Sequence, residues 1–86
     1  MAPGTPAERK LAQIWCEVLG VPEVSAGDDF FSLGGNSLKF AQIATHISEA
    51  FGTTVDLRSL LVYPTLRDLA GYITAEQPAR GPEEEA

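Results

Sequence analysis

Residues 30–40 read FFSLGGNSLKF, and this stretch marks the change from a long loop to a helix. Apolar residues recur at helical spacing directly after Asn36 and Ser37, which predicts a helix that begins at about Ser37. Asparagine and serine both cap helices well, because their side chains accept hydrogen bonds from free backbone N–H groups. Asn36 is sufficient as the cap. Ser37 is therefore either a second capping residue or a surface hydroxyl with another role.

The predicted second helix runs from about residue 37 to residue 51, and Gly52 ends it. Leu38, Ala41 and Thr45 form a second, shallower face of this helix, which is either solvated or a contact surface for a partner. The apolar residues that form its buried stripe are Phe40, Ile43, Ala44, Ile47 and Phe51.

The first helix is predicted over about residues 6–19. It starts with TPAE at residues 5–8, a capping box with proline at the first helical position, and Gly20 follows its last turn. Residues 20–36 then show no sustained period and form a long loop. The aromatic residues Phe30 and Phe31 can anchor this loop to the core. Its two adjacent glycines allow another backbone to approach closely.

Two further helices follow. Asp56 can cap a short helix over about residues 57–62, which Pro64 stops because the residue before a proline resists the helical conformation. Thr65 starts the last helix, with Leu66, Leu69, Ala70 and Ile73 facing inward. Gly71 within that helix either weakens it or marks a close contact with another helix.

No segment alternates like a β-strand, so the expected fold is all-α: a bundle of three longer helices and one short helix, with a long loop between the first two. The expected organisation is a flexible N-terminus (1–5), the helical domain (6–75) and a disordered acidic tail or linker (76–86). The start at Met1 and the acidic ending fit both a free-standing protein and an excised domain. The predicted shared core is Leu11, Trp15, Phe31, Ile43, Ile47, Leu61, Leu69 and Ile73.

The composition excludes several classes of function. The chain has 86 residues and a net charge of −6, which argues against binding to nucleic acid or to anionic membranes. No apolar run approaches the length that crosses a bilayer. The single cysteine allows no internal disulfide, so a cytoplasmic location is expected.

The sequence offers no catalytic base or metal site. Ser37 lies in GNSLK, which lacks the final glycine and the preceding strand of a hydrolase nucleophile elbow. His46, the only histidine, is nine residues further along the same helix. This spacing places it on the opposite face and about 13.5 Å along the axis. His46 is interpreted as a surface residue and Cys16 as a half-buried apolar one. Ser37 remains a surface hydroxyl without its own base.

Three stretches together resemble a known family. DDFFSLGGNSL (28–38), EAFG (49–52) and YPTLRDLA (63–70) occur in the order found in peptidyl carrier (thiolation) domains of nonribosomal peptide synthetases. The resemblance extends from about residue 6 to residue 74. It implies a non-catalytic carrier that receives 4′-phosphopantetheine from coenzyme A on Ser37 and holds aminoacyl, peptidyl or aryl intermediates as thioesters on that arm. The implied motif is Leu33, Gly34, Gly35, Asn36, Ser37 and Leu38.

The resemblance also implies partners. They are a phosphopantetheinyl transferase that uses magnesium, an adenylation enzyme, and condensation, tailoring or thioesterase domains, with the carrier itself a monomer. The implied partner contacts are Leu33, Leu38, Ala41 and Leu60. One position departs from the family pattern, because Asn36 stands where Asp or His is common, and this affects which transferase and partners recognise the chain.

Two alternatives remain open. One is a polyketide-type acyl carrier. The predicted second helix is nearly neutral, with Lys39 and Glu49 as its charged residues, whereas carriers of fatty acid synthesis have strongly acidic ones. This favours the peptide carrier. The other alternative is a helical interaction module that carries no modification and does not need Ser37.

Overall fold

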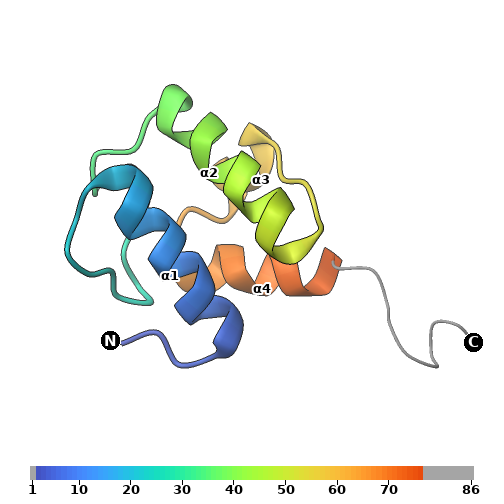
Figure 1. The fold of residues 1–86 in the computed structure, drawn as a ribbon, viewed down its shortest axis with the longest axis horizontal. Helices are drawn as coiled ribbons and strands as arrows, with labels where there is room; N and C mark the ends of the chain where they lie inside the picture. The colour runs from blue at the N-terminus through green and yellow to red at the C-terminus, as the bar shows by residue number, and fades with distance from the viewer. Residues whose placement is uncertain (1, 77–86) are drawn as a thin grey trace, which may run out of the picture.

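The computed structural model describes residues 2–76 and contains four α-helices in that range (Figure 1). They are α1 (Pro6–Leu19), α2 (Ser37–Phe51), α3 (Leu57–Val62) and α4 (Leu66–Glu76). This confirms the predicted all-α fold, its single short helix and its long first loop. The predicted acidic tail lies outside the described residues from position 77 onward. The predicted flexibility of residues 1–5 stays a prediction.

Local caps set the ends of α1. The Oγ1 atom of Thr5 accepts a hydrogen bond from the N–H of Glu8 at 3.0 Å, as the capping box predicts. The Glu8 carboxylate accepts from the N–H of Gly4 at 2.8 Å, one residue earlier than the usual capping-box partner. Gly20 ends the helix with a φ of 72°, a left-handed conformation that glycine adopts without steric cost. Gly52 ends α2 with the same φ.

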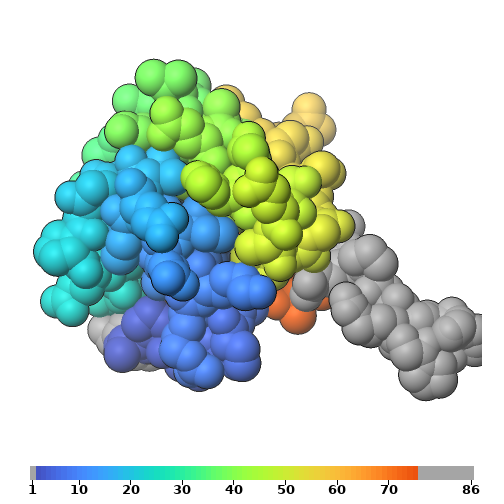
Figure 2. Space-filling view, in the orientation of Figure 1, coloured from blue at the N-terminus to red at the C-terminus, as the bar shows by residue number. Residues whose placement is uncertain are grey.

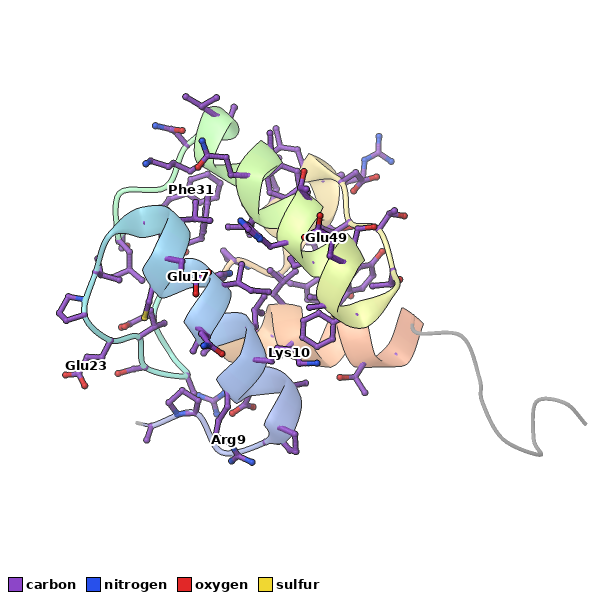
Figure 3. The ribbon with its side chains drawn as sticks, viewed as in Figure 1. Arg9, Lys10, Glu17, Glu23, Phe31 and Glu49 are labelled. Atoms are coloured by element: carbon purple, nitrogen blue, oxygen red, sulfur yellow. The ribbon has the colours of Figure 1, made fainter. Side chains whose placement is uncertain are left out.

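Two lysines join α1 and α2 at opposite ends. Lys10, near the start of α1, donates to the carbonyl oxygen of Ala50 at 3.4 Å, and its Nζ lies 5.4 Å from the ring centroid of Phe51 (Figure 3). Lys39, near the start of α2, donates to the carbonyl oxygen of Val18 at 3.2 Å. Because each lysine reaches the far end of the other helix, α1 and α2 run antiparallel. α1 also packs against α4, which crosses behind it in Figure 1.

The core is centred on Trp15, which is fully buried and meets the ring of Phe30 edge-on at a centroid distance of 5.3 Å. Six of the eight predicted core residues are buried. The prediction was wrong at Phe31, which is 38% exposed, and at Leu61, which is 61% exposed. The other fully buried large side chains are Phe30, Leu11, Ile43, Ile47, Leu60, Leu66, Leu69 and Ile73.

In both wrong cases the preceding residue, Phe30 or Leu60, is the buried one. The LLV run at the end of α3 offers several apolar residues in succession, so periodicity does not identify the inward one. The pair FF lies in the loop, where no helical period applies. Phe30 is held there by its N–H, which donates to the carbonyl oxygen of Pro64 at 2.9 Å.

The long first loop pairs with the connection between α3 and α4. Besides the bond from Phe30, the N–H of Leu66 donates to the carbonyl oxygen of Asp28 at 3.0 Å, and that of Arg67 to the carbonyl oxygen of Ala26 at 2.8 Å. Asp29 and Thr65 form an isolated antiparallel bridge between the same segments. Backbone hydrogen bonds therefore hold the long loop before α2 against the start of α4.

Asp28 and Asp29, the two aspartates of the long first loop, both form turns. Asp28 Oδ2 accepts from the N–H of Ser25 at 2.8 Å, and Asp29 Oδ2 accepts from the N–H of Ser32 at 2.9 Å. Gly71 of α4 makes no close helix contact, because a Cβ there would meet no heavy atom within 4 Å. Of the two alternatives given for Gly71 from the sequence, the close contact with another helix is wrong.

The stability of α3 is expected to depend on pH through its cap. Asp56 Oδ1 accepts hydrogen bonds from the backbone N–H and the hydroxyl of Ser59, each at 2.9 Å. The backbone bond, followed by the side-chain bond, lowers the pKa of Asp56 below its usual value. A lowered folded-state pKa means that the carboxylate stabilises α3 above the unfolded-state pKa of about 3.9. This contribution is lost as the pH falls through the folded-state value.

The measurement is an acid titration followed by NMR. We expect the amide resonance of Ser59 to shift, and α3 to lose protection from hydrogen exchange, below about pH 4. Asp56→Asn keeps a side-chain acceptor that does not titrate, so this variant should lose the acid response. An identical response in Asp56→Asn would contradict the role assigned to the carboxylate.

Candidate functional site

The start of α2 leaves the Ser37 hydroxyl exposed and unused. Asn36 is the N-cap, because its Oδ1 accepts from the N–H of Lys39 at 2.9 Å and its carbonyl oxygen accepts from the N–H of Phe40 at 2.7 Å. Ser37 is the first residue of the helix. Within residues 2–76 its hydroxyl makes no hydrogen bond. Figure 2 shows the start of α2, in green, at an edge of the molecule that solvent can reach.

The backbone at this position suits an anion. The N–H groups of Ser37 and Leu38 have no hydrogen-bond partner in the described part of the chain, as expected for the first turn of a helix. α2 has no acidic residue in its first turn. Free N–H groups and the helix dipole both favour negative charge there. The site therefore fits the phosphodiester that would link 4′-phosphopantetheine to Ser37 Oγ.

The glycine pair before the site has two separate roles. Gly34 has a φ of 99°, a conformation that other residues rarely adopt. Gly35 lies against the ring of Phe30, and a Cβ on Gly35 would overlap that ring, lying 2.7 Å from its Cζ and closer still to Cδ2 and Cε2. The sequence indicated that these glycines allow another backbone to approach closely, which stays a prediction. Within the chain, the close neighbour of Gly35 is a side chain of the same loop.

Several apolar side chains of the loop, α2 and α3 are exposed, but not all of those predicted. Leu38 is 68% exposed, Ala41 is exposed and Leu33 is half-buried. Leu60 is fully buried and cannot contact a partner, so this part of the prediction was wrong. α3 exposes Leu61 and Val62 instead. The only sequence signal for them is the LLV run, in which one residue must face inward and its neighbours outward.

Phe31 adds to the exposed apolar surface of the loop. Figure 3 shows it close to the start of α2. Its ring meets that of Phe30 edge-on at a centroid distance of 5.5 Å, so one face of Phe31 covers the core while the rest reaches solvent.

Among residues 2–76, the Ser37 hydroxyl has no hydrogen-bonded base. His46 lies exposed on α2, and residues 2–76 contain no group of three His, Cys, Asp or Glu side chains that could hold a metal ion. Burial, with smaller contributions from Glu23 and Glu17, raises the pKa of the Cys16 thiol. The thiol is therefore protonated at neutral pH and weakly nucleophilic, in agreement with its interpretation as a half-buried apolar residue. No helix in the described range is long and apolar enough to cross a membrane.

Comparison with known proteins identifies the class of domain. The family described as "Phosphopantetheine attachment site" matches residues 9–73. Phosphinothricin tripeptide synthetase PhsB of Streptomyces viridochromogenes is 46% identical over 78 residues, which cover 91% of this chain and 7% of that protein. Tyrocidine synthase 3 of Brevibacillus parabrevis is 41% identical over 94% of this chain and 1% of its own length. The chain thus spans a small fraction of these relatives.

Solved structures support the same class of domain. A chain from the structure of the phosphopantetheine transferase Sfp in complex with coenzyme A and a peptidyl carrier protein has a TM-score of 0.85 and 36% identity, covering 88% of this chain and 99% of that one. The solution structure of an active-site mutant of a peptidyl carrier protein has a TM-score of 0.87 and 34% identity, covering 93% and 89%. The fold and site thus define a helical carrier domain. The chain belongs to the phosphopantetheine-attachment family, and it is a carrier domain rather than a catalyst.

Proposed function

We propose that this chain is a peptidyl carrier domain of a nonribosomal peptide synthetase and that Ser37 is its attachment residue. The observation that carries this proposal is the exposed hydroxyl of Ser37 at the start of α2. Asn36 caps this helix, so the Ser37 hydroxyl is not needed for capping. Ser37 also lies within the matched residues 9–73. The relatives named above are peptide synthetases, which supports this pathway over the polyketide alternative.

The chain's own part in the reaction is presentation. Ser37 Oγ attacks the pantetheine-bearing phosphorus of coenzyme A and forms the new O–P bond of the phosphodiester. The P–O bond of the pyrophosphate breaks, and adenosine 3′,5′-bisphosphate leaves. The Ser37 proton passes to the transferase, since no residue of this site serves as base. The free N–H groups of Ser37 and Leu38 then face the phosphate charge. The terminal thiol of the bound arm supplies the thioester that holds the cargo. A transferase that uses coenzyme A is the proposed partner for this step, as for the carrier in the Sfp complex.

We propose that the partner surface consists of Leu33, Leu38, Ala41, Leu61 and Val62. The first three are retained from the sequence interpretation, and the α3 pair replaces the buried Leu60. Such a surface is small, which suits transient contacts with an adenylation enzyme and with condensation, tailoring or thioesterase domains in turn. A cytoplasmic, monomeric carrier is part of the proposal.

Aminoacyl transfer tests the proposed pathway. The chain, first modified with coenzyme A and a broad-specificity transferase, is incubated with ATP and a panel of amino-acid-adenylating enzymes. Intact mass spectrometry should show the gain of an aminoacyl group. Leu61→Asp should lower the rate of this gain, because it places a charge on the proposed contact surface. Ala75→Asp, at an exposed position of α4, should not. Malonyl transfer from a polyketide acyltransferase without any aminoacyl gain would contradict the proposal.

A further inference from the structure

Phe30 is held from several sides. Its side chain is fully buried and packs edge-on against Trp15, with an interplanar angle of 68°. Its N–H donates to the carbonyl oxygen of Pro64 at 2.9 Å. The first contact joins Phe30 to α1 and the second joins it to the segment before α4. The position of the Phe30 ring is therefore set by two elements that are distant in sequence.

Gly35 connects the Phe30 ring to the start of α2. The N–H of Gly35 donates to the carbonyl oxygen of Phe30 at 3.0 Å, which closes the turn between them. The Gly35 Cα lies so close to the Phe30 ring that even a methyl group would not fit. Gly35 is bonded directly to Asn36, the cap, and Ser37 follows. The placement of the Ser37 hydroxyl relative to the core thus depends on the contact between Gly35 and Phe30.

We propose that Phe30 is a positioning residue for the attachment reaction, acting through Gly35 on Ser37. This inference rests on the proposed function of Ser37 as the attachment residue. Reaction requires Ser37 Oγ to meet the phosphate in a defined geometry, and a misplacement of about 1 Å can lower a rate by about 100-fold. Leu38 and Leu61 are exposed and belong to the proposed partner surface, whereas Phe30 is fully buried. Loss of positioning should therefore lower kcat while leaving recognition, and hence KM, nearly unchanged.

The test uses kcat and KM of a broad-specificity transferase for the carrier, at a temperature where circular dichroism shows each variant folded. We expect Gly35→Ala to lower kcat by about tenfold or more, with KM close to that of the wild type. Phe30→Leu should also lower kcat. The double variant should recover part of the activity lost in Gly35→Ala, because leucine lacks Cε2 and Cζ, two of the three ring atoms that the new methyl group would overlap.

Two controls separate positioning from stability. Gly27→Ala changes another glycine of the same loop, where the nearest atom to a Cβ is 3.9 Å away, and should leave kcat unchanged. Ile73→Val weakens the core away from the loop and should also leave kcat unchanged in the folded protein.

An unchanged kcat in folded Gly35→Ala would overturn the inference. If Gly35→Ala does not fold, an unchanged kcat in Phe30→Leu would overturn it. A wild-type chain that accepts no phosphopantetheine would instead refute the proposed function, and the inference with it, so the two failures are distinguishable.

Discussion

Ser37→Ala is expected to abolish phosphopantetheine attachment completely and to leave the helical fold intact. The Ser37 hydroxyl makes no hydrogen bond within the described range, and the cap of α2 is provided by Asn36. Alanine is also the best helix former at an exposed helical position. The free energy of unfolding should therefore change by no more than about 0.5 kcal/mol. Urea denaturation followed by circular dichroism measures this change, and intact mass spectrometry measures attachment.

Two other variants complete this comparison. Asn36→Ala removes the cap and should cost about 1 kcal/mol, which shows that the cap resides at residue 36 and not at residue 37. Ser32→Ala removes an exposed serine of the preceding loop and should leave attachment unchanged. Unfolding of Ser37→Ala would mean that Ser37 is structural. Attachment to Ser37→Ala would mean that another residue accepts the group.

Trp15→Ala is expected to have the opposite effect and to threaten the fold itself. Trp15 is fully buried at the centre of the core and in ring contact with Phe30, so its truncation should cost about 3–5 kcal/mol. A domain of this size has a total stability of about 4–13 kcal/mol, so the loss is a large fraction of the whole. Because Trp15 is the only tryptophan, unfolding is followed by far-ultraviolet circular dichroism rather than by fluorescence.

Trp15→Phe provides the matched control. The indole Nε1 of Trp15 is buried and has no hydrogen-bond partner among residues 2–76, an arrangement that costs about 1–3 kcal/mol. Phenylalanine removes this unpaired N–H and keeps an aromatic ring next to Phe30. It should therefore destabilise the domain much less than alanine does. A loss below about 1 kcal/mol in Trp15→Ala would contradict the central place of this residue in the core.

The helix boundaries could be predicted because their causes are local. Thr5 and Asn36 cap through hydrogen bonds to N–H groups three residues away, and Gly20 and Gly52 end their helices through their own φ. The sequence also pointed to Ser37 as the proposed attachment residue. Asn36 can cap the helix without it, and the resemblance of residues 28–38 to carrier domains implies its role.

The contacts that place the site could not be predicted, because their partners are distant in sequence. The bond from Phe30 to Pro64 joins two loops, and it determines which residue of the FF pair enters the core. The same contact places the Phe30 ring next to Gly35. The need for glycine at position 35 therefore follows from a packing contact that the sequence does not reveal. On α3, Leu61 rather than Leu60 faces solvent for a similar reason, because packing decides among adjacent apolar residues.

Mapping the modified residue tests the central claim most directly. The wild-type chain is incubated with coenzyme A, magnesium and a broad-specificity phosphopantetheinyl transferase and is then digested with trypsin. Cleavage after Lys10 and Lys39 releases residues 11–39, which contain Ser25, Ser32 and Ser37, so fragmentation of this peptide must identify the modified serine. We predict a single phosphopantetheinyl group on Ser37. A group on Ser25 or Ser32, or an unmodified peptide after treatment with several transferases, would contradict the assignment of Ser37 as the attachment residue.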